Sequence, residues 1–322
     1  MIISRTPFRI SFFGGGTDYP AWFEKYEGAV LSTTIDKYCY INIRYLPPFF
    51  EHKHRIVHSF VENVKTSSQI KHPVVRAILE YFKIEKGVEI HHDGDLPARS
   101  GLGSSSSFTV GMLNSFYALK GKIISKSQLS KEAIYIEREV LKESVGSQDQ
   151  IAVAHGGFNK IIFRNDDNFR VEAVTLPKER IEELQSHLML VFTGFSRFAS
   201  EIAAEQIKNT HNKEKELNAM RNMVDEAVEI LNSDREDIVE FGRLLNESWQ
   251  IKKRLSARVS NSEVDSLYEK ALKHGAIGGK LLGAGGGGFM LLFVKPEHRE
   301  KVADKLKTFL EVKFKFEGEG SQ

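Results

Sequence analysis

The chain has 322 residues, of which 41% are hydrophobic and 27% are charged, and its formal net charge is +2. This composition is typical of a globular protein with one large or two medium domains. Both signs of charge are interspersed, which argues against a nucleic-acid partner. The single cysteine, Cys39, excludes an intramolecular disulfide and a zinc cluster of cysteines.

The N-terminal segment does not resemble a targeting sequence. The apolar run MIISRTPFRISFF contains arginines and is followed by three glycines, whereas a secretory signal has an uninterrupted apolar core. No stretch approaches the roughly 18 apolar residues of a membrane-spanning helix. We therefore expect a cytoplasmic protein without a membrane partner.

The N-terminal half is predicted to be rich in strands. Phe8, Ile10 and Phe12 alternate with Arg9 and Ser11, which predicts a strand that ends at the glycine-rich segment GGGTDYP. Further strands are predicted at 29–35, 38–46, 54–61, 87–92, 156–163 and 169–176, and helices at about 73–82, 104–119 and 127–143.

After about residue 180 the pattern becomes mostly helical. A short apolar strand at 188–194 precedes helical residues from 199 to about 258, with a break near 232–234. A helix at 264–275, a glycine-rich loop with an apolar strand within 276–296, and a helix at 297–309 follow. Strands and helices mixed without βαβ regularity predict an α+β protein with two domains, 1–180 and 181–322.

The segment SGLGSSSSF combines two glycines with four serines at the predicted start of a helix. Helix N-termini present unpaired N–H groups, and glycines let a ligand approach the backbone, so Gly101, Gly103 and the serines predict a phosphate site. The segment lacks the lysine of a Walker A loop and the third glycine of GxGxxG. The plain alternative is a helix cap, for which one serine would suffice.

Two acidic residues accompany this loop. Residues 133, 134, 137, 140 and 141 share one helical face, on which Glu137 is the only polar residue. A carboxylate in an apolar stripe requires a cation or a buried arginine partner. Asp149 follows at the start of another element, where a simple helix cap is the alternative. With Arg9, these groups favour metal-assisted phosphoryl transfer.

Three segments then resemble the signature motifs of the GHMP kinases, the family that includes galactokinase, homoserine kinase and mevalonate kinase. They are PFRISFFGGGTDYP, DLPARSGLGSSSSF and KLLGAGGGGFMLLF, in the family's order. The resemblance implies an N-terminal domain like ribosomal protein S5 and a ferredoxin-like C-terminal domain, with ATP between them. Galactokinases carry Glu-His in place of Gly15-Gly16, and mevalonate-type enzymes carry glycine in place of Arg99.

Within the family the chain is most similar to kinases of D-glycero-D-manno-heptose 7-phosphate. That similarity implies transfer of the ATP γ-phosphoryl group to the anomeric hydroxyl of this sugar, for nucleotide-activated heptose synthesis. A kinase for L-fucose is the nearest alternative, and a non-catalytic sugar or nucleotide sensor is a second one. Whether the protein is a monomer or a homodimer stays open.

The resemblance also implies roles for individual residues. Ser105 and Glu137 would bind Mg²⁺, Asp149 would be the base, and Arg9 would support it. The triphosphate would lie on the loop residues Gly101, Leu102, Gly103, Ser104, Ser105 and Ser106, closed over by Gly285 and Gly286. The sugar would contact Asp18 together with Gly15, Gly16 and Thr17. The acceptor's own phosphate needs a cation, for which Arg197, Arg99, and the basic run Lys252, Lys253 and Arg254 are candidates.

Overall fold

The computed structural model describes residues 1–165, 168–194, 199–233 and 235–322. The strands are β1 (Ile2–Phe13), β2 (Gly28–Tyr45), β3 (His54–Val57), β4 (Val61–Val64), β5 (Val88–Gly94), β6 (Phe158–Phe163), β7 (Phe169–Ala173), β8 (Leu188–Phe192), β9 (Ala276–Leu281), β10 (Phe289–Val294), β11 (Leu310–Val312) and β12 (Phe316–Glu317). The helices are α1 (Pro20–Phe23), α2 (Pro73–Tyr81), α3 (Ser104–Leu119), α4 (Lys126–Tyr135), α5 (Gln148–His155), α6 (Lys178–His187), α7 (Ala199–Asn209), α8 (Glu214–Asn232), α9 (Val239–Lys253), α10 (Ser262–His274) and α11 (Arg299–Lys305). Shorter helical turns are η1 (Ser67–Gln69), η2 (Ile136–Val140), η3 (Thr210–Asn212) and η4 (Pro296–His298).

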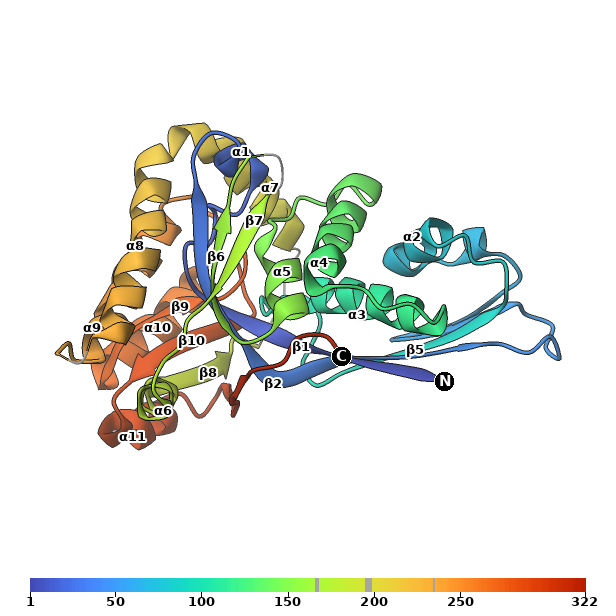
Figure 1. The fold of residues 1–322 in the computed structure, drawn as a ribbon. Coiled ribbons are helices and arrows are strands. Elements are labelled where there is room, and N and C mark those ends of the chain that lie inside the picture. The colour runs from blue at the N-terminus through green and yellow to red at the C-terminus, as the bar shows by residue number, and fades with distance from the viewer. Residues whose placement is uncertain (166–167, 195–198, 234) are drawn as a thin grey trace.

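Within these residues the strands form two sheets, which confirms the predicted α+β class. The larger, eight-stranded sheet has the order β4-β3-β5-β2-β6-β7, and both β1 and β12 pair with β2. The smaller sheet has the order β11-β8-β10-β9. Figure 1 shows α3, α4 and α5 beside the long strands β1 and β2, with α8, α9 and the smaller sheet at one end of these strands and α2 at the other.

Strand β1 shows the predicted alternation, but both of its faces are buried. Phe8, Ile10 and Phe12 lie in the main core, and Arg9 on the opposite face is also buried. The reason is that α3 and α5 cover the face that carries Arg9. Because this face of β1 is covered, its polar side chains lie against α3 and α5. These two helices carry the candidate site.

The strand predictions were partly wrong in their boundaries. The two strands expected at 29–35 and 38–46 are one strand, β2, because Asp36 and Lys37 between them form a bulge opposite Pro7 and Phe8 of β1. The strand expected at 54–61 is the hairpin of β3 and β4. The glycine-rich loop expected within 276–296 starts later than predicted, because residues 276–281 form strand β9. The glycines of this strand lie so close to neighbouring atoms that a side chain would not fit there.

The C-terminal residues return to the larger sheet. Strand β12 pairs with β2, and Gln322 exchanges two backbone hydrogen bonds with Arg5, of 2.8 and 2.9 Å. The predicted domain boundary near residue 180 stays a prediction. The C-terminal segment does not follow it, because this segment pairs with strands of the N-terminal half. In the part of the chain that the structure describes, no helix has the length and apolarity needed to cross a bilayer.

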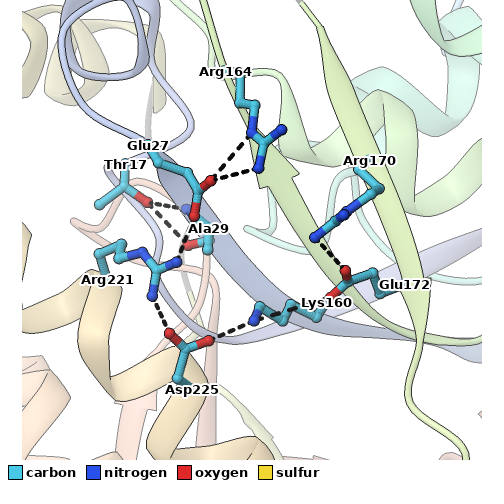
Figure 2. A network of polar contacts seen from close by, with 9 residues as sticks. All are labelled: Thr17, Glu27, Ala29, Lys160, Arg164, Arg170, Glu172, Arg221 and Asp225. Carbon is cyan, nitrogen blue, oxygen red and sulfur yellow. Dashed lines mark hydrogen bonds and ion pairs between the residues drawn. The ribbon is translucent and has the colours of Figure 1, made fainter.

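A network of ion pairs fastens α8 to the larger sheet. Glu27, just before β2, accepts hydrogen bonds from Arg164 after β6 and from Arg221 of α8. Arg221 also binds Asp225 one turn further along the helix, and Asp225 pairs with Lys160 of β6 at 2.5 Å. Figure 2 shows these contacts, with the Arg170 and Glu172 pair of β7 beside them. Residues far apart in sequence are thereby held at one junction.

Candidate active site

The serine-rich loop leads into a helix at Ser104, as predicted, and the N-terminus of that helix is uncapped. Gly103 is the N-cap of α3 with φ of 74°, and no side chain of the described residues caps the helix. The first helical bond runs from the N–H of Ser107 to the carbonyl of Gly103, at 2.8 Å. The N–H groups of residues 104–106 therefore have no partner within the helix. The loop presents donors and partial positive charge suited to phosphate oxygens.

The residues of this loop serve different purposes. The Leu102 side chain is fully buried in the core, and its carbonyl accepts a 3.0 Å bond from the N–H of Arg9. Gly101 takes a positive φ of 83°, which glycine adopts without strain. The hydroxyl of Ser104 accepts a 3.0 Å bond from the N–H of Arg99. Leu102 is therefore a backbone contributor only.

Arg9 and Asp149 form a two-bond ion pair directly beside the loop. Nε and Nη2 of Arg9 each donate to one carboxylate oxygen of Asp149, at 2.8 Å, and Nη1 donates to the carbonyl of Gly101 at 2.7 Å. The Arg9 side chain is 3% exposed and that of Asp149 is 26% exposed. The arginine is thus locked, whereas the carboxylate keeps one side open to a ligand.

Asp18 lies in the turn after β1, close to the same pair. Its Oδ1 accepts a 2.9 Å bond from the N–H of Gly16, and its carbonyl accepts a 3.0 Å bond from the N–H of Ser147. Burial raises the pKa of Asp18, the Gly16 bond opposes this, and the negative charge of Asp149 adds to the rise. The structure therefore brings Asp18 and Asp149 together from segments more than a hundred residues apart.

The other residues of that turn support Asp18 through the backbone. Thr17 is fully buried, and its hydroxyl bonds the carbonyls of Gly14 and Ala29, at 2.8 and 2.9 Å. Figure 2 shows Thr17 and Ala29 joined in this way next to the ion-pair network. Gly15 and Gly16 leave room for close approach. The Thr17 hydroxyl is fully used inside the protein, so a sugar contact through it is not what the geometry favours.

Glu137 is a buried acid, as its place in an apolar stripe predicted. It is 0% exposed and lies in the π-helical turn η2, which follows α4. Its Oε2 accepts bonds from the Ser106 hydroxyl and the Gln150 side-chain amide, whereas Oε1 is buried and has no hydrogen-bond partner among the described residues. The Thr109 side chain also acts on this carboxylate and opposes the rise of its pKa. Burial raises the pKa of Glu137 to about 7. The plain alternative of a buried arginine partner is not what these contacts show.

The hydroxyl that reaches Glu137 belongs to Ser106 and not to Ser105. Ser105 is exposed, and among the described residues no hydrogen bond joins it to Glu137. Successive residues of an α-helix are rotated by about 100°, so only one of two neighbouring serines can point inward here. The resemblance implied that Ser105 and Glu137 share a magnesium ion and that Ser106 contacts the triphosphate. That assignment stays a prediction, beside the direct bond between Ser106 and Glu137.

The second glycine-rich loop lies against the first. A Cβ atom at Gly101 would lie 2.5 Å from the carbonyl oxygen of Leu282, and one at Gly288 would lie 2.2 Å from that of Ser100. Gly285 and Gly286 instead pack on the segment after α9, where the N–H of Gly286 donates to Val259 at 2.9 Å. These two predicted ATP contacts thus lie between Gly283 and Gly288, the two glycines of this loop that pack on the serine-rich loop.

The candidate cations for an acceptor phosphate are placed differently. Arg99 is exposed at the start of the serine-rich loop, with a positive φ of 59°, and its charge acts on Glu143. Arg197 lies outside the described residues. Lys253 lies at the end of α9 and pairs with Asp265 at 3.4 Å, as expected of a surface charge.

The sequence alone did not point to several of the residues that surround this site. Lys280 of β9 is buried beside it and was not singled out, although a lysine within a short apolar strand was a usable signal. Gln148, one residue before Asp149, accepts a 2.7 Å bond from Ser11 of β1. No sequence pattern pairs residues 11 and 148, because their contact depends on the fold.

Comparison with known proteins agrees with this geometry. The family model for the GHMP kinase N-terminal domain matches residues 69–157, and the model for the C-terminal domain matches residues 223–312. A D-glycero-alpha-D-manno-heptose 7-phosphate kinase of Campylobacter jejuni is 32% identical over 95% of this chain and 93% of its own length. The chain belongs to the GHMP kinase family.

Two further proteins are similar to most of this chain. A crystal structure of a D-glycero-D-manno-heptose 1-phosphate kinase from Bacteroides thetaiotaomicron has a TM-score of 0.81 and 26% identity, over 100% of this chain and 98% of its own. A bifunctional fucokinase/GDP-fucose pyrophosphorylase of Arabidopsis thaliana is 25% identical over 92% of this chain and 30% of its own length. The predicted family and fold are thereby confirmed.

Proposed function

We propose that this GHMP kinase transfers the γ-phosphoryl group of ATP to the anomeric hydroxyl of D-glycero-D-manno-heptose 7-phosphate. The observation that carries the proposal is the pairing of Arg9 with Asp149 at the edge of an uncapped helix N-terminus, with Asp18 beside it. A phosphate loop, a fixed carboxylate and a second carboxylate for sugar hydroxyls are the parts that a sugar kinase needs.

The residues of the site would act mainly by positioning and by charge. Backbone N–H groups at the start of α3 would hold the phosphates of ATP. Asp149 would accept a hydrogen bond from the anomeric hydroxyl and then its proton, because its open side faces the ligand space. Arg9 would keep that carboxylate oriented, since both of its oxygens are held. Asp18 would accept hydrogen bonds from other hydroxyls of the sugar.

The site also fits a magnesium ion. Oε1 of Glu137 is a buried carboxylate oxygen without a hydrogen-bond partner, and such an atom is costly unless a cation or a proton neutralises it. Mg²⁺ characteristically takes one or two protein oxygens and completes its shell with water and substrate phosphates. When bound, Mg²⁺ would neutralise charge on the phosphate oxygens of ATP. Glu137 would hold it, with Ser105 as the exposed hydroxyl on the loop side.

The choice of acceptor rests on the relatives. The C. jejuni relative is named for heptose 7-phosphate and the B. thetaiotaomicron structure for heptose 1-phosphate, so both act on phosphorylated heptoses by their names. For this chain the 7-phosphate is the acceptor with a free anomeric hydroxyl. Its 1,7-bisphosphate product would supply nucleotide-activated heptose synthesis. The similarity to a fucokinase makes L-fucose the second candidate.

A substrate panel tests this proposal. ADP release would be measured with Mg·ATP and heptose 7-phosphate, unphosphorylated heptose, mannose, galactose, L-fucose or mevalonate. We expect the highest kcat/KM for heptose 7-phosphate, with the new phosphate placed on C1 by ³¹P–¹H NMR of the product. Turnover of L-fucose in preference to heptose 7-phosphate would replace the acceptor. ATP binding without turnover of any sugar would favour a sensor.

A further inference from the structure

Two lysine side chains are buried next to the Arg9 and Asp149 pair. Lys252, in the last turn of α9, is 4% exposed, and Lys280 of β9 is 2% exposed. Lysine is rarely buried to this extent unless a carboxylate pairs with it. Among the ion pairs of the described residues, none involves Lys252 or Lys280, in contrast to the neighbouring Lys253. Both ammonium groups therefore lie inside the protein without a countercharge in direct contact.

Backbone carbonyls take only part of the donor capacity of these lysines. Nζ of Lys252 donates to the carbonyls of Leu281 and Gly283, at 3.0 and 2.5 Å. Nζ of Lys280 donates to the carbonyl of Phe12, at 2.6 Å. An ammonium group has three N–H donors, so one donor of Lys252 and two of Lys280 have no partner among these bonds.

The carbonyls that the lysines bind belong to the segments that build the site. Gly283 packs on Gly101, because a Cβ atom at Gly283 would lie 2.6 Å from the Cα of Gly101. Phe12 is near the end of β1, just before the turn that carries Asp18. Lys252 thus lies where the two glycine-rich loops meet. Lys280 lies at the start of the turn that carries Asp18.

The local charges are unbalanced. With both lysines protonated, three cations, Arg9, Lys252 and Lys280, lie close to two carboxylates, and Arg9 already binds Asp149. Burial and the charges of Lys252 and Arg9 lower the pKa of Lys280 well below its usual value, so a bound anion would favour its charged form. Asp18 is the remaining carboxylate that acts on both lysines. Burial lowers the pKa of Lys252 to about 7, the charge of Arg9 lowers it further, and Asp18 opposes this. An anion that entered this space would compensate the excess positive charge and would take the unused N–H donors.

We propose that Lys252 and Lys280 form a binding site for a phosphate oxyanion of the reactants, at the junction of the two glycine-rich loops and the Asp18 turn. The proposal rests on the proposed kinase function and deepens it. Two sources offer this chemistry, the terminal phosphate of ATP and the phosphate carried by the acceptor. A lysine is a compact point charge that suits either one.

Calorimetric binding measurements separate the two sources. The variants are Lys252→Met and Lys280→Met, which keep most of the length of the side chain and remove its charge, with Lys253→Met as the control from the same helix. The ligands are two pairs: Mg·AMPPNP against Mg·ADP, and heptose 7-phosphate against unphosphorylated heptose. A terminal-phosphate site predicts at least a tenfold loss for AMPPNP and an unchanged affinity for ADP. An acceptor-phosphate site predicts the same contrast between the two heptoses.

The opposite results are equally clear. Unchanged affinities for all four ligands, or equal losses within both pairs, mean that the lysines only anchor backbone carbonyls, and the proposal is then overturned. If the wild-type protein binds neither heptose, the proposed acceptor is wrong, whereas the nucleotide pair still tests the lysines.

A measurement on the unaltered protein covers the case in which the variants do not fold. With ¹⁵N-labelled lysine, titration with inorganic phosphate is expected to shift two buried Nζ resonances together, because the anion contacts both ammonium groups. The absence of any shift in buried Nζ signals up to millimolar phosphate argues against the site.

Discussion

The guanidinium group of Arg9 holds both carboxylate oxygens of Asp149, through two hydrogen bonds of 2.8 Å. The third contact of Arg9, to the carbonyl of Gly101, ties this pair to the phosphate loop. The planar fork of arginine fixes the carboxylate in orientation as well as in position, which a lysine could not do. The orientation of the proposed base relative to the serine-rich loop is therefore fixed by one side chain.

Asp149→Asn tests the role of this carboxylate. The amide keeps nearly the same shape but cannot accept a proton, so kcat is expected to fall at least about 100-fold. The Kd of Mg·AMPPNP is expected to stay within about threefold, because the loop N–H groups are unchanged. Stopped-flow ADP release and calorimetry measure the two quantities. A kcat near that of the wild type would remove Asp149 from the role of base.

Glu137→Gln tests the metal assignment. The substitution keeps the bond from Ser106 possible and removes the charge that Mg²⁺ requires. The Mg²⁺ concentration for half-maximal activity is therefore expected to rise at least about tenfold, with activity partly restored at high Mg²⁺. Ser106→Ala is the control variant, because the Ser106 hydroxyl contacts Glu137 but is not proposed as a ligand of the metal. If Glu137→Gln leaves the Mg²⁺ dependence as it is, the ion binds elsewhere.

Gly146→Ala tests the position of Asp18. A Cβ atom at residue 146 would lie 1.9 Å from Oδ2 of Asp18, a distance at which one of the two must move. We expect KM for the sugar to rise about tenfold or more, with little change in nucleotide affinity. Gly318→Ala is the control, because nothing lies within 4 Å of a Cβ atom there. Equal behaviour of the two variants would show that Asp18 does not bind the acceptor.

The sequence predicts local features of this site better than their partners. The burial of Glu137 followed from its apolar neighbours. The same helical pattern predicted that Val140 is buried too, which is wrong, because Val140 is 42% exposed. The cause is the π-helical turn η2, in which the Leu141 N–H bonds Ile136 five residues earlier and shifts the face that points inward. A regular period of 3.6 residues cannot anticipate such a turn.

Contacts between distant segments were the least predictable part. Alternation placed Arg9 on a face of β1, and the residue types grouped it with Glu137 and Asp149 as parts of one site. The family resemblance then placed it directly beside Asp149, 140 positions later. Lys280 escaped notice because the glycines around it concealed the strand β9. The final segment that completes the larger sheet is two residues long as a strand, too short for any periodic pattern.

His72 makes the stability of the protein depend on pH. It stacks on Phe108 with ring centroids 4.7 Å apart, and its Nδ1 is buried without a partner. Burial lowers the pKa of His72 to about 4, the charges of His58 and His92 add to this, and Glu62 opposes it. The unfolded chain therefore binds a proton at higher pH than the folded protein does. The free energy of unfolding is expected to fall as the pH drops from about 6.5 through about 4.

The free energy of unfolding of the wild type is expected to be lower at pH 5 than at pH 7.5. His72→Gln is expected to make this difference smaller by about 1 to 2 kcal/mol. Urea unfolding at the two pH values measures it. His211→Gln, at an exposed position, is the control and should keep the wild-type pH profile. Parallel profiles for all three proteins would mean that His72 is not the group responsible.

Arg221→Met tests whether the ion-pair network of Figure 2 fastens α8 to the larger sheet. The wild-type side chain is 18% exposed and joins Glu27, before β2, to Asp225 on its own helix. Because the acidic partners are more exposed, we expect a loss of only about 1 kcal/mol in the free energy of unfolding at low salt. The difference from the wild type should shrink in 1 M NaCl, since screening weakens exposed pairs.

Arg243→Met is the matched control for that experiment. Arg243 is 63% exposed, and its one ion pair among the described residues is with Glu240 of the same helix, α9, so its loss should change stability by less than about 0.5 kcal/mol. The network also bears on the site, because α8 packs against the glycine turn through Val224, 2.7 Å from where a Cβ atom at Gly14 would lie. Arg221→Met should therefore raise KM for the sugar more than Arg243→Met does. Equal destabilisation by the two variants, with the same salt response, would mean that α8 is held by its apolar face alone.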